Sequence, residues 1–196
     1  YFEIGSPGLI ERGNGSPAIA GSQHTGELPP MDELAEQLRE RMEENPDNAE
    51  GWFLLGRTYM RLQNYSQAVS AYEQVVRLMP DEPAGLLSLA DALIMRDGMQ
   101  TGTMALELLE KALRLDPQNV TALWLLGNAA YDNGAVGGAL HYWQRAYPLL
   151  ASEPEMQAQL GRRITEAGGE LPAVAGVADL PPIMSAADQA IPTAST

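Results

Sequence analysis

The feature that most constrains this chain is a sequence repeat with a period of about 34 residues, which runs through its central part. Pro46, Pro80 and Pro117 follow predicted helix ends, and roughly one period separates each from the next. Gly56 and Gly127 are separated by roughly two periods. A fixed period of this size indicates a supersecondary unit that stacks on copies of itself, because one unit alone cannot bury its apolar face. The sequence therefore predicts a solenoid of stacked units.

The residue types within each period identify the unit as a tetratricopeptide repeat (TPR), a pair of antiparallel helices. Its signature places Trp, Leu-Gly and Tyr on the first helix, Ala and an aromatic residue on the second, and Pro after the second. The first repeat, residues 49–82, carries the whole signature: Trp52, Leu55, Gly56, Tyr59, Ala68, Tyr72 and Pro80. The repeats at 83–119 and 120–153 follow it more loosely, and the former holds three extra residues in its inner turn at 97–102.

These repeats predict an all-α TPR helical solenoid: three TPR repeats, an N-terminal half-repeat helix and a C-terminal capping helix. We expect helices near residues 31–44, 49–62, 65–78, 83–96, 103–114, 119–132, 135–149 and 153–167. The first fits the second helix of an incomplete repeat, because Pro46 stands where the closing proline would be. The last begins with Ser152 and Glu155 at capping-box spacing, and we expect it to cover the apolar edge of the third repeat.

The segments on either side of the TPR domain, residues 31–167, have a different composition. Residues 1–30 contain clustered Gly, Ser and Pro without helical periodicity, which predicts a flexible lead-in that follows a membrane anchor. Residues 168–196 are rich in Ala and Pro and contain no Lys or Arg, which predicts a disordered tail.

Small residues of the signature fall where the two helices of a repeat approach each other most closely. A side chain larger than Gly or Ala would push the helices apart at these points, and large residues fill the space beside them. We therefore expect Trp52, Tyr59, Tyr72 and Trp143 in the core and not in a binding site.

The composition argues against several classes of function. The formal net charge of −14 argues against nucleic acid as a partner, because phosphates require Lys and Arg patches. The chain has no Cys, and neither His24 nor His141 has a second ligand at metal-binding spacing, so we expect no metal site and no cofactor. It contains no phosphate-binding loop, dinucleotide fingerprint or nucleophile elbow, and we predict that it is not an enzyme.

The remaining candidate site is the face that the first helices of the repeats share. In a TPR solenoid this face lines a concave groove, through the second, fifth, ninth and twelfth residues of each repeat. These positions hold Glu50, Phe53, Arg57, Met60, Ala84, Leu87, Asp91, Ile94, Thr121, Trp124, Asn128 and Tyr131. Six of the twelve are large and apolar, which is unusual for a solvent-facing surface unless something covers it.

The favoured occupant is an amphipathic helix from another protein, because its apolar anchors recur at helical spacing. The alternative is that the superhelix closes and these residues pack on each other or on a tail. TPR co-chaperones instead grip an acidic C-terminal carboxylate with Lys, Arg and Asn at the fifth and ninth positions. The three repeats have no Lys at these positions, and Asp91 would repel a carboxylate, so we do not expect that mode.

Four strings of the sequence carry a family resemblance: NPDNAEGW at 45–52, LGRTYM at 55–60, LRLDPQN at 113–119 and YW at 142–143. They resemble the periplasmic TPR domain of the apocytochrome c chaperone of cytochrome c maturation (CcmI/CycH type). The lengthened inner turn of the second repeat is a further feature of that family. Residues 1–9 resemble the segment that follows its second membrane helix. The resemblance covers about two thirds of the chain, from Leu34 to Ala167.

The resemblance implies a periplasmic domain that is tethered to the bacterial inner membrane by a segment absent from this chain. It implies a chaperone that holds the C-terminal helix of apocytochrome c and delivers it to the haem ligation machinery, whose members carry the haem chemistry. A sister family, the TPR subunit of nitrite reductase maturation, has similar repeats, and the sequence does not separate the two. A third interpretation is a TPR scaffold that joins subunits of an envelope complex without a client.

Overall fold

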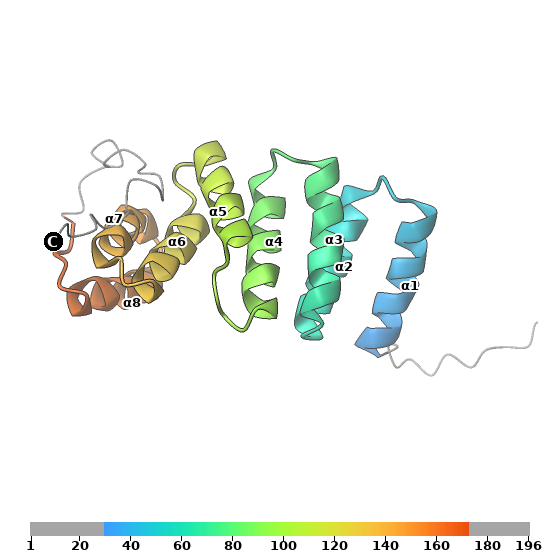
Figure 1. Ribbon diagram of the computed structural model, residues 1–196, viewed down its shortest axis with the longest axis horizontal. Helices are drawn as coiled ribbons and strands as arrows, with labels where there is room; N and C mark the ends of the chain where they lie inside the picture. The colour runs from blue at the N-terminus through green and yellow to red at the C-terminus, as the bar shows by residue number, and fades with distance from the viewer. Residues whose placement is uncertain (1–29, 173–196) are drawn as a thin grey trace, which may run out of the picture.

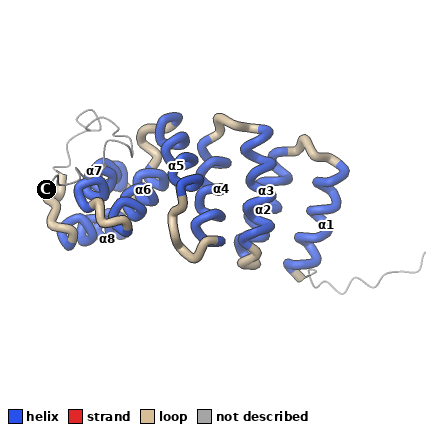
Figure 2. The backbone as a smooth tube through the Cα atoms, in the orientation of Figure 1, coloured by secondary structure: helices blue, strands red, loops and turns tan. Residues whose placement is uncertain are grey.

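The computed structural model describes residues 30–172 and arranges them as a row of helices from α1 to α8 (Figure 1). The elements are α1 (Met31–Glu44), α2 (Ala49–Arg61), α3 (Tyr65–Leu78), α4 (Pro83–Arg96), α5 (Thr103–Leu115), α6 (Val120–Asp132), α7 (Val136–Ala146), the 3₁₀ helix η1 (Tyr147–Leu150) and α8 (Pro154–Glu166). These residues contain no strand (Figure 2). Predicted and observed helices agree to within one residue at every end except that of α7, and the all-α TPR solenoid is confirmed.

Consecutive helices pair as hairpins, and the hairpins stack. Each of the three repeats is one pair: α2 packs on α3, α4 on α5, and α6 on α7. Contacts of α3 with α4 and of α5 with α6 join successive repeats, while α1 packs against α2 at one end. At the other end α8 packs against η1 and α7, so that every repeat has a neighbour on both sides.

The glycines of the signature lie where the two helices of a repeat touch. A Cβ atom on Gly56 would lie 2.5 Å from Cε1 of Tyr72, and one on Gly127 would lie 2.3 Å from Cδ1 of Trp143. Both distances are far below van der Waals contact, so a larger residue would force the helices apart. The second repeat has Ala90 at the equivalent place, where its partner position holds the smaller Leu109, and both are fully buried.

The aromatic residues that were predicted to form the core do so with one exception. Tyr59, Tyr72 and Trp143 are buried, with at most 4% of their surface exposed. Trp52 packs against the core but is only half-buried. Its indole N–H donates a hydrogen bond to the carbonyl oxygen of Pro46 (2.9 Å), so one edge of the ring stays near the surface turn between α1 and α2.

In the later repeats, hydrogen bonds from side chains also reach the carbonyl groups of the closing prolines. Lys111 Nζ donates to the carbonyl of Pro80 (2.6 Å), and Arg145 Nη2 donates to the carbonyl of Pro117 (3.0 Å). Lys111 and Arg145 lie one repeat period apart, at equivalent positions of the second helix, so the contact repeats with the architecture. Each bond ties the closing turn of one repeat to the next repeat. Burial lowers the pKa of the Arg145 guanidinium.

Prolines account for two differences from the prediction, the end of α7 and the start of α8. The helix predicted to run to residue 149 ends at Ala146 and continues as η1, because Pro148 has no N–H to donate to the preceding helical turn. The predicted capping box at Ser152 is wrong. Glu153 is the N-cap residue of α8 and makes no side-chain capping bond, while Pro154 at the first turn supplies the required φ angle and removes one unpaired donor.

Residues 168–172, which the sequence analysis assigned to the tail, continue the packing of α7 and α8. The amide of Gly169 donates to the carbonyl of Ile164 (2.8 Å), and Gln144 Nε2 donates to the carbonyl of Glu170 (2.8 Å). The rest of the predicted tail and the predicted lead-in at 1–29 lie outside the described residues. Between residues 30 and 172, no helix has both the length and the apolar character needed to span a bilayer.

Candidate peptide-binding groove

The first helices of the repeats, α2, α4 and α6, present the predicted positions in two parallel rows. Fifth positions form an apolar row of half-buried side chains: Phe53, Leu87 and Trp124. Ninth positions form a polar row: Arg57, Asp91 and Asn128. Residues four apart on a helix lie on the same side, so each repeat contributes one member to both rows. We call the surface that carries these rows the first-helix face.

A polar group lies on this face between the first and second repeats. The Tyr72 hydroxyl group forms a hydrogen bond with the side chain of Ser88. The charges of Arg57 and Asp91 are close enough to act on the same hydroxyl group. Burial raises the pKa of Tyr72 to about 12. The side chain of Asp91 is exposed. The surrounding helices nevertheless displace part of the water around its carboxyl group, and this desolvation raises the pKa of that group.

Two aromatic residues of the face lean on the core of their own repeat. The rings of Phe53 and Tyr72 meet edge to face, with centroids 5.6 Å apart, and those of Tyr131 and Trp143 lie 5.5 Å apart. Tyr131 remains 42% exposed, so one side of its ring is held by the core while the other faces solvent. Such side chains are already ordered before a partner binds, which lowers the entropy lost on binding.

The remaining predicted positions divide between surface and core. Glu50 is exposed, and so are Ala84 and Thr121; Met60 is half-buried against the core. The expectation for Ile94 is wrong, because this residue is 5% exposed and belongs to the core. Ile94 lies on α4, the first helix of the middle repeat. The sequence of α4, PAGLLSLADALIMR, is apolar on almost every side, and the helix packs on α3 and α5.

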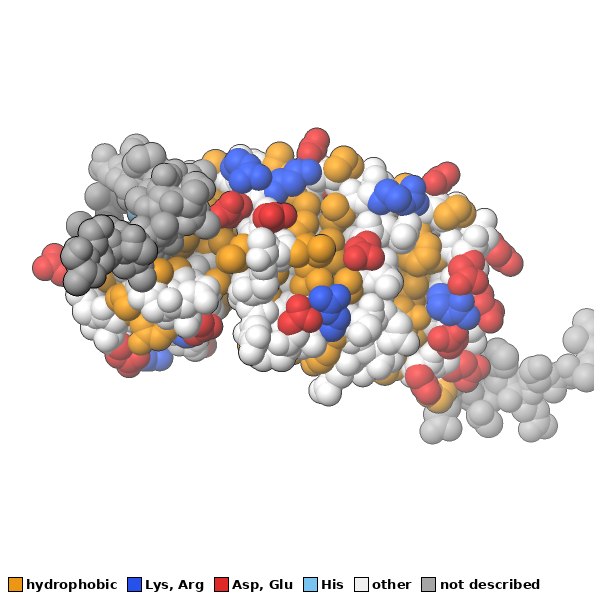
Figure 3. All heavy atoms as spheres, in the orientation of Figure 1, with side chains coloured by type: hydrophobic (Ala, Val, Ile, Leu, Met, Phe, Trp, Pro, Cys, Tyr) orange, Lys and Arg blue, Asp and Glu red, His pale blue; other side chains and the backbone are white. Residues whose placement is uncertain are grey.

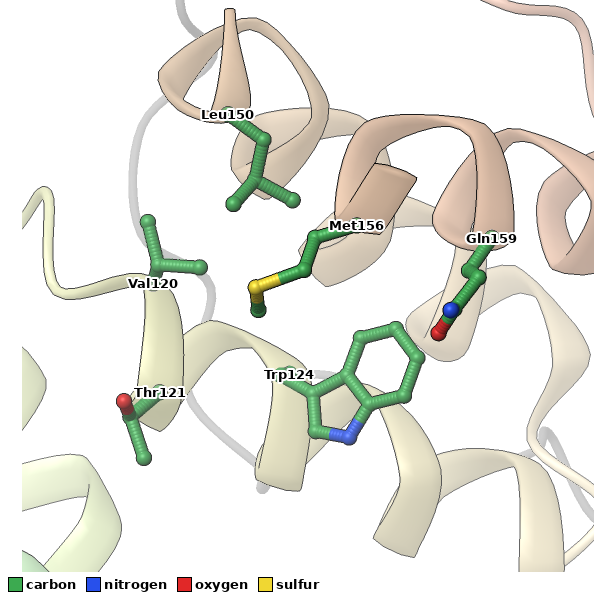
Figure 4. A pocket seen from close by; sticks show the side chains of 6 residues that line it. All are labelled: Val120, Thr121, Trp124, Leu150, Met156 and Gln159. Atoms are coloured by element: carbon green, nitrogen blue, oxygen red, sulfur yellow. The ribbon is translucent and has the colours of Figure 1, made fainter. Parts of the chain in front are cut away.

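Next to Trp124 the structure has a cavity that the sequence analysis did not predict. It has a volume of about 150 Å³ and is lined by Val120, Thr121, Trp124, Leu150, Met156 and Gln159 (Figure 4). The indole points toward the side chains of Met156 and Gln159, which come from α8. Helix α8 therefore contributes to the same face as α6 and does more than close the solenoid.

A second cavity of about 370 Å³ lies between α6 and α8. Its walls are Trp124, Tyr131, Gln159, Arg162, Arg163 and Glu166. The guanidinium carbon of Arg163 lies 5.5 Å from the centroid of the Trp124 ring and 5.2 Å from that of the Trp143 ring. Both distances lie within the range of cation–π attraction.

A sequence signal for this role of α8 exists. Leu160 and Gly161 lie one repeat period after Leu126 and Gly127 of the third repeat, and all four are buried. Helix α8 is thus the first helix of an incomplete fourth repeat, in which Ala158 and Arg162 occupy the fifth and ninth positions. The Trp and Tyr of the signature are absent from it, which hides the pattern.

Metal-binding groups do not gather on this face. Within residues 30–172, no cluster of three or more His, Cys, Asp or Glu side chains could hold a metal ion. His141 is half-buried and its ring lies 5.7 Å from that of Tyr142, while His24 lies outside the described residues. The arrangement offers apolar contact, hydrogen bonds and charge, which are the means of binding a peptide.

Comparison with known proteins places the chain in a family. The family described as the TPR domain of cytochrome c-type biogenesis protein H matches residues 20–157. The chain belongs to this family. The cytochrome c-type biogenesis protein H domain thus covers α1 to the first turn of α8, and Arg162 and Arg163 lie beyond the matched residues.

Curated relatives agree with the family. The chain is 35% identical over 155 residues to cytochrome c-type biogenesis protein CycH of Pseudomonas aeruginosa, covering 76% of this chain and 38% of that protein. It is 31% identical over 137 residues to cytochrome c-type biogenesis protein CcmH of Escherichia coli, covering 70% of this chain and 39% of that protein. The chain therefore spans about two fifths of the length of these relatives. Subunit NrfG of the formate-dependent nitrite reductase complex of Escherichia coli O157:H7 is 30% identical and is covered over 57% of each chain.

Solved structures confirm the fold alone. The crystal structure of MamA superposes with a TM-score of 0.54 at 20% identity, over 70% of this chain and 86% of that one. The TPR domain of Sgt2 from Aspergillus fumigatus gives a TM-score of 0.50 at 24% identity, over 71% and 92%.

Proposed function

We propose that this domain is a chaperone module of cytochrome c maturation that holds the C-terminal helix of an apocytochrome c along its first-helix face. The observation that carries the proposal is the apolar row of Phe53, Leu87 and Trp124, which runs across three successive repeats and ends at the cavity beside α8. Support also comes from the biogenesis proteins to which the chain is related.

The chemistry of the face suits an amphipathic helix. Apolar side chains that recur every three or four residues of such a helix would contact the apolar row, and polar side chains beside them would meet the polar row. The Oδ1 atom of Asn128 is buried and accepts no hydrogen bond from residues 30–172, so this half-buried side chain would turn toward the bound segment to gain a donor there. Asp91 offers a second acceptor in the same row.

The proposed role is binding without catalysis. In this proposal the haem and its attachment belong to the ligation machinery, to which the domain delivers its client. We place the domain in the periplasm, tethered to the inner membrane by a segment outside this chain. The support for this location is the resemblance of the chain to the CcmI/CycH family.

A second candidate client is a nitrite reductase. The observation that favours it is the similarity to NrfG, a subunit of a formate-dependent nitrite reductase complex, at 30% identity over 57% of both chains. The two candidates differ in the client, so a measurement of binding decides between them.

Isothermal titration with synthetic peptides tests the proposal. The parent domain should bind the C-terminal helix of an apocytochrome c, and Trp124→Ala should weaken binding about thirtyfold, since truncating an aromatic anchor removes about 2 kcal/mol. Trp52→Ala is the matched control: this indole is also half-buried, but it contacts Pro46 and lies away from the first-helix face. It should lower stability and leave the affinity of the folded protein unchanged.

Three outcomes would change the conclusion. Binding of a nitrite reductase C-terminal peptide in preference to the apocytochrome peptide would support the second candidate. Equal affinity of the Trp124→Ala variant and the parent would place the binding surface elsewhere. Binding of folded envelope subunits but of neither peptide would support the scaffold interpretation.

A further inference from the structure

We propose that the α8 end of the first-helix face is a carboxylate-binding site that takes the free C-terminal carboxylate of the bound segment. The site consists of Arg162 and Arg163 at the cavity between α6 and α8. This inference rests on the proposed function, because it assumes that a peptide lies along the face, and it adds which end of that peptide lies where.

The guanidinium of Arg163 is held in place by aromatic rings. It lies over the indoles of Trp124 and Trp143, and Trp143 is fully buried. Cation–π contacts of this kind restrict a long side chain without neutralising its charge. An arginine with fixed orientation loses little entropy when it binds a carboxylate, and its planar donor pairs match the two oxygens of that group.

Neither arginine is committed to an acidic side chain of the described part of the chain. Within residues 30–172, the basic side chains that form ion pairs within 4 Å of an acidic side chain are Arg39, Arg96, Lys111 and Arg114. Glu166 lines the same cavity but does not come within that distance of Arg162 or Arg163. Two guanidinium groups at one cavity are unusual in a chain with a net charge of −14, and they attract an anion.

The place of Arg162 in the repeat connects it to the polar row. It lies one repeat period after Asn128 and occupies the ninth position of the incomplete fourth repeat. The three complete repeats have no Lys at their fifth and ninth positions, which argued against recognition of a carboxylate. Among the fifth and ninth positions of the complete repeats only Arg57 is a cation, whereas helix α8 places two arginines together at the end of the face where the row stops. A bound segment that follows the row has its own end there.

Charge along the solenoid supports the same direction. Helix α1 carries six acidic and two basic side chains, and acidic groups gather at that end of the molecule (Figure 3). A bound helix has a partial positive charge at its N-terminus and a partial negative charge at its C-terminus, in addition to the terminal carboxylate. It is therefore most stable with its N-terminus toward α1 and its C-terminus against α8.

The test uses two synthetic peptides of an apocytochrome c C-terminal helix, identical except that one ends in a free carboxylate and the other in an amide. The parent domain should bind the free acid about tenfold more tightly, since a hydrogen-bonded charge contributes about 1.5–3 kcal/mol and each 1.4 kcal/mol is tenfold. Arg162→Gln and Arg163→Gln should each reduce this preference, measured within each variant as the ratio of its affinities for the free acid and the amide. Arg163→Lys, which keeps the charge, should retain part of it.

Arg77→Gln is the matched control, because Arg77 is an exposed arginine on α3, and it should leave the preference intact. Equal affinity for both peptides, with Trp124→Ala still weakening each, would overturn the carboxylate site and leave the proposed function standing. Failure of both peptides to bind would overturn both proposals. A third peptide, amidated and ending in Glu, would overturn the assignment to a chain terminus if it bound as tightly as the free acid.

Discussion

The two ends of the first-helix face differ in both packing and charge. At the α2 end, Phe53 rests on Tyr72 of its own repeat, and acidic side chains of α1 lie beyond it. At the α8 end, Trp124 borders two cavities and contacts Arg163. Under the proposed function, the difference predicts that binding energy is concentrated where a large apolar side chain has open space beside it, and that the acidic end sets the direction of the bound segment.

The largest expected effect separates core from surface within the third repeat. Trp143→Ala should lower the free energy of unfolding by about 3–5 kcal/mol, because the ring is fully buried against Gly127. Trp124→Ala removes the same side chain from a half-buried position and should lower it by less than half as much. Urea unfolding followed by circular dichroism measures both. Equal losses would mean that Trp124 is a core residue and not an anchor.

The second prediction compares the two ends of the apolar row in binding. Phe53→Ala should weaken peptide affinity about threefold, against about thirtyfold for Trp124→Ala, because the two cavities described above both adjoin Trp124 and neither is lined by Phe53. Titration of both variants with one peptide gives the ratio directly. A larger loss for Phe53→Ala would reverse the assignment of the two ends.

The third prediction concerns the inner turns of the first and third repeats. Gln63 and Gly134 follow the C-terminal ends of α2 and α6, with positive φ angles of 59° and 77°. This backbone conformation favours glycine. Gln63→Gly should raise stability by up to about 1 kcal/mol, and Gly134→Ala should lower it by about 1 kcal/mol. A Cβ atom on Gly134 would touch nothing within 4 Å, so the change isolates the backbone.

Gly137→Ala is the control for that pair. It also has open space around its Cβ position, but it lies in α7 without a positive φ angle, so it should be neutral or stabilising. Thermal melts of the three variants decide the point. Destabilisation by Gly137→Ala equal to that by Gly134→Ala would show that φ is not the cause.

The smallest effect is a pH dependence of opposite sign at two aspartates of the second repeat. The pKa of Asp91 is raised, so the folded state binds its proton more readily, and stability from this group falls as pH rises from about its ordinary pKa of 3.8 through the raised value. The pKa of Asp97 is lowered by its hydrogen bond to Arg96, so its contribution is present above 3.8 and is lost as pH falls through the lowered value.

Asparagine variants test these signs. Asp91→Asn should be slightly more stable than the parent at pH 7, by about 0.5 kcal/mol or less, and this advantage should shrink as the pH approaches 4. Asp97→Asn should be less stable than the parent at pH 7, and this difference should shrink in acid. Melting temperatures across this range measure both, and equal slopes for the two variants would contradict the assignment.

Periodicity was sufficient to predict the fold because each TPR unit repeats the same contacts. Gly56 and Gly127 mark the close approaches, and the closing prolines mark the helix ends, so the helices followed from spacing alone. Ile94 could not be placed in the same way. Its position in the repeat predicts exposure, but α4 is apolar on nearly all sides and neighbours cover it.

The α8 end of the site was the harder part to predict. Arg163 reaches Trp124 across the boundary between α6 and α8, so its role depends on how far the chain continues to stack. The cavities likewise arise from side chains of helices that are separated in sequence. A sequence reading that recognised Gly161 as a fourth signature glycine would have extended the rows and included Arg162.

Paramagnetic relaxation in an isotopically labelled peptide shows which end of the bound segment lies at which end of the first-helix face. The chain has no Cys, so Glu50→Cys and Glu155→Cys each create a single attachment point for a spin label. Both glutamates are exposed and occupy the second position of their repeats, on α2 and α8. With the bound C-terminus at α8, the label at position 155 should broaden signals from the C-terminal residues of the peptide, and the label at position 50 should broaden those from its N-terminal residues. Broadening in the opposite order, or from neither position, would contradict this placement of the peptide.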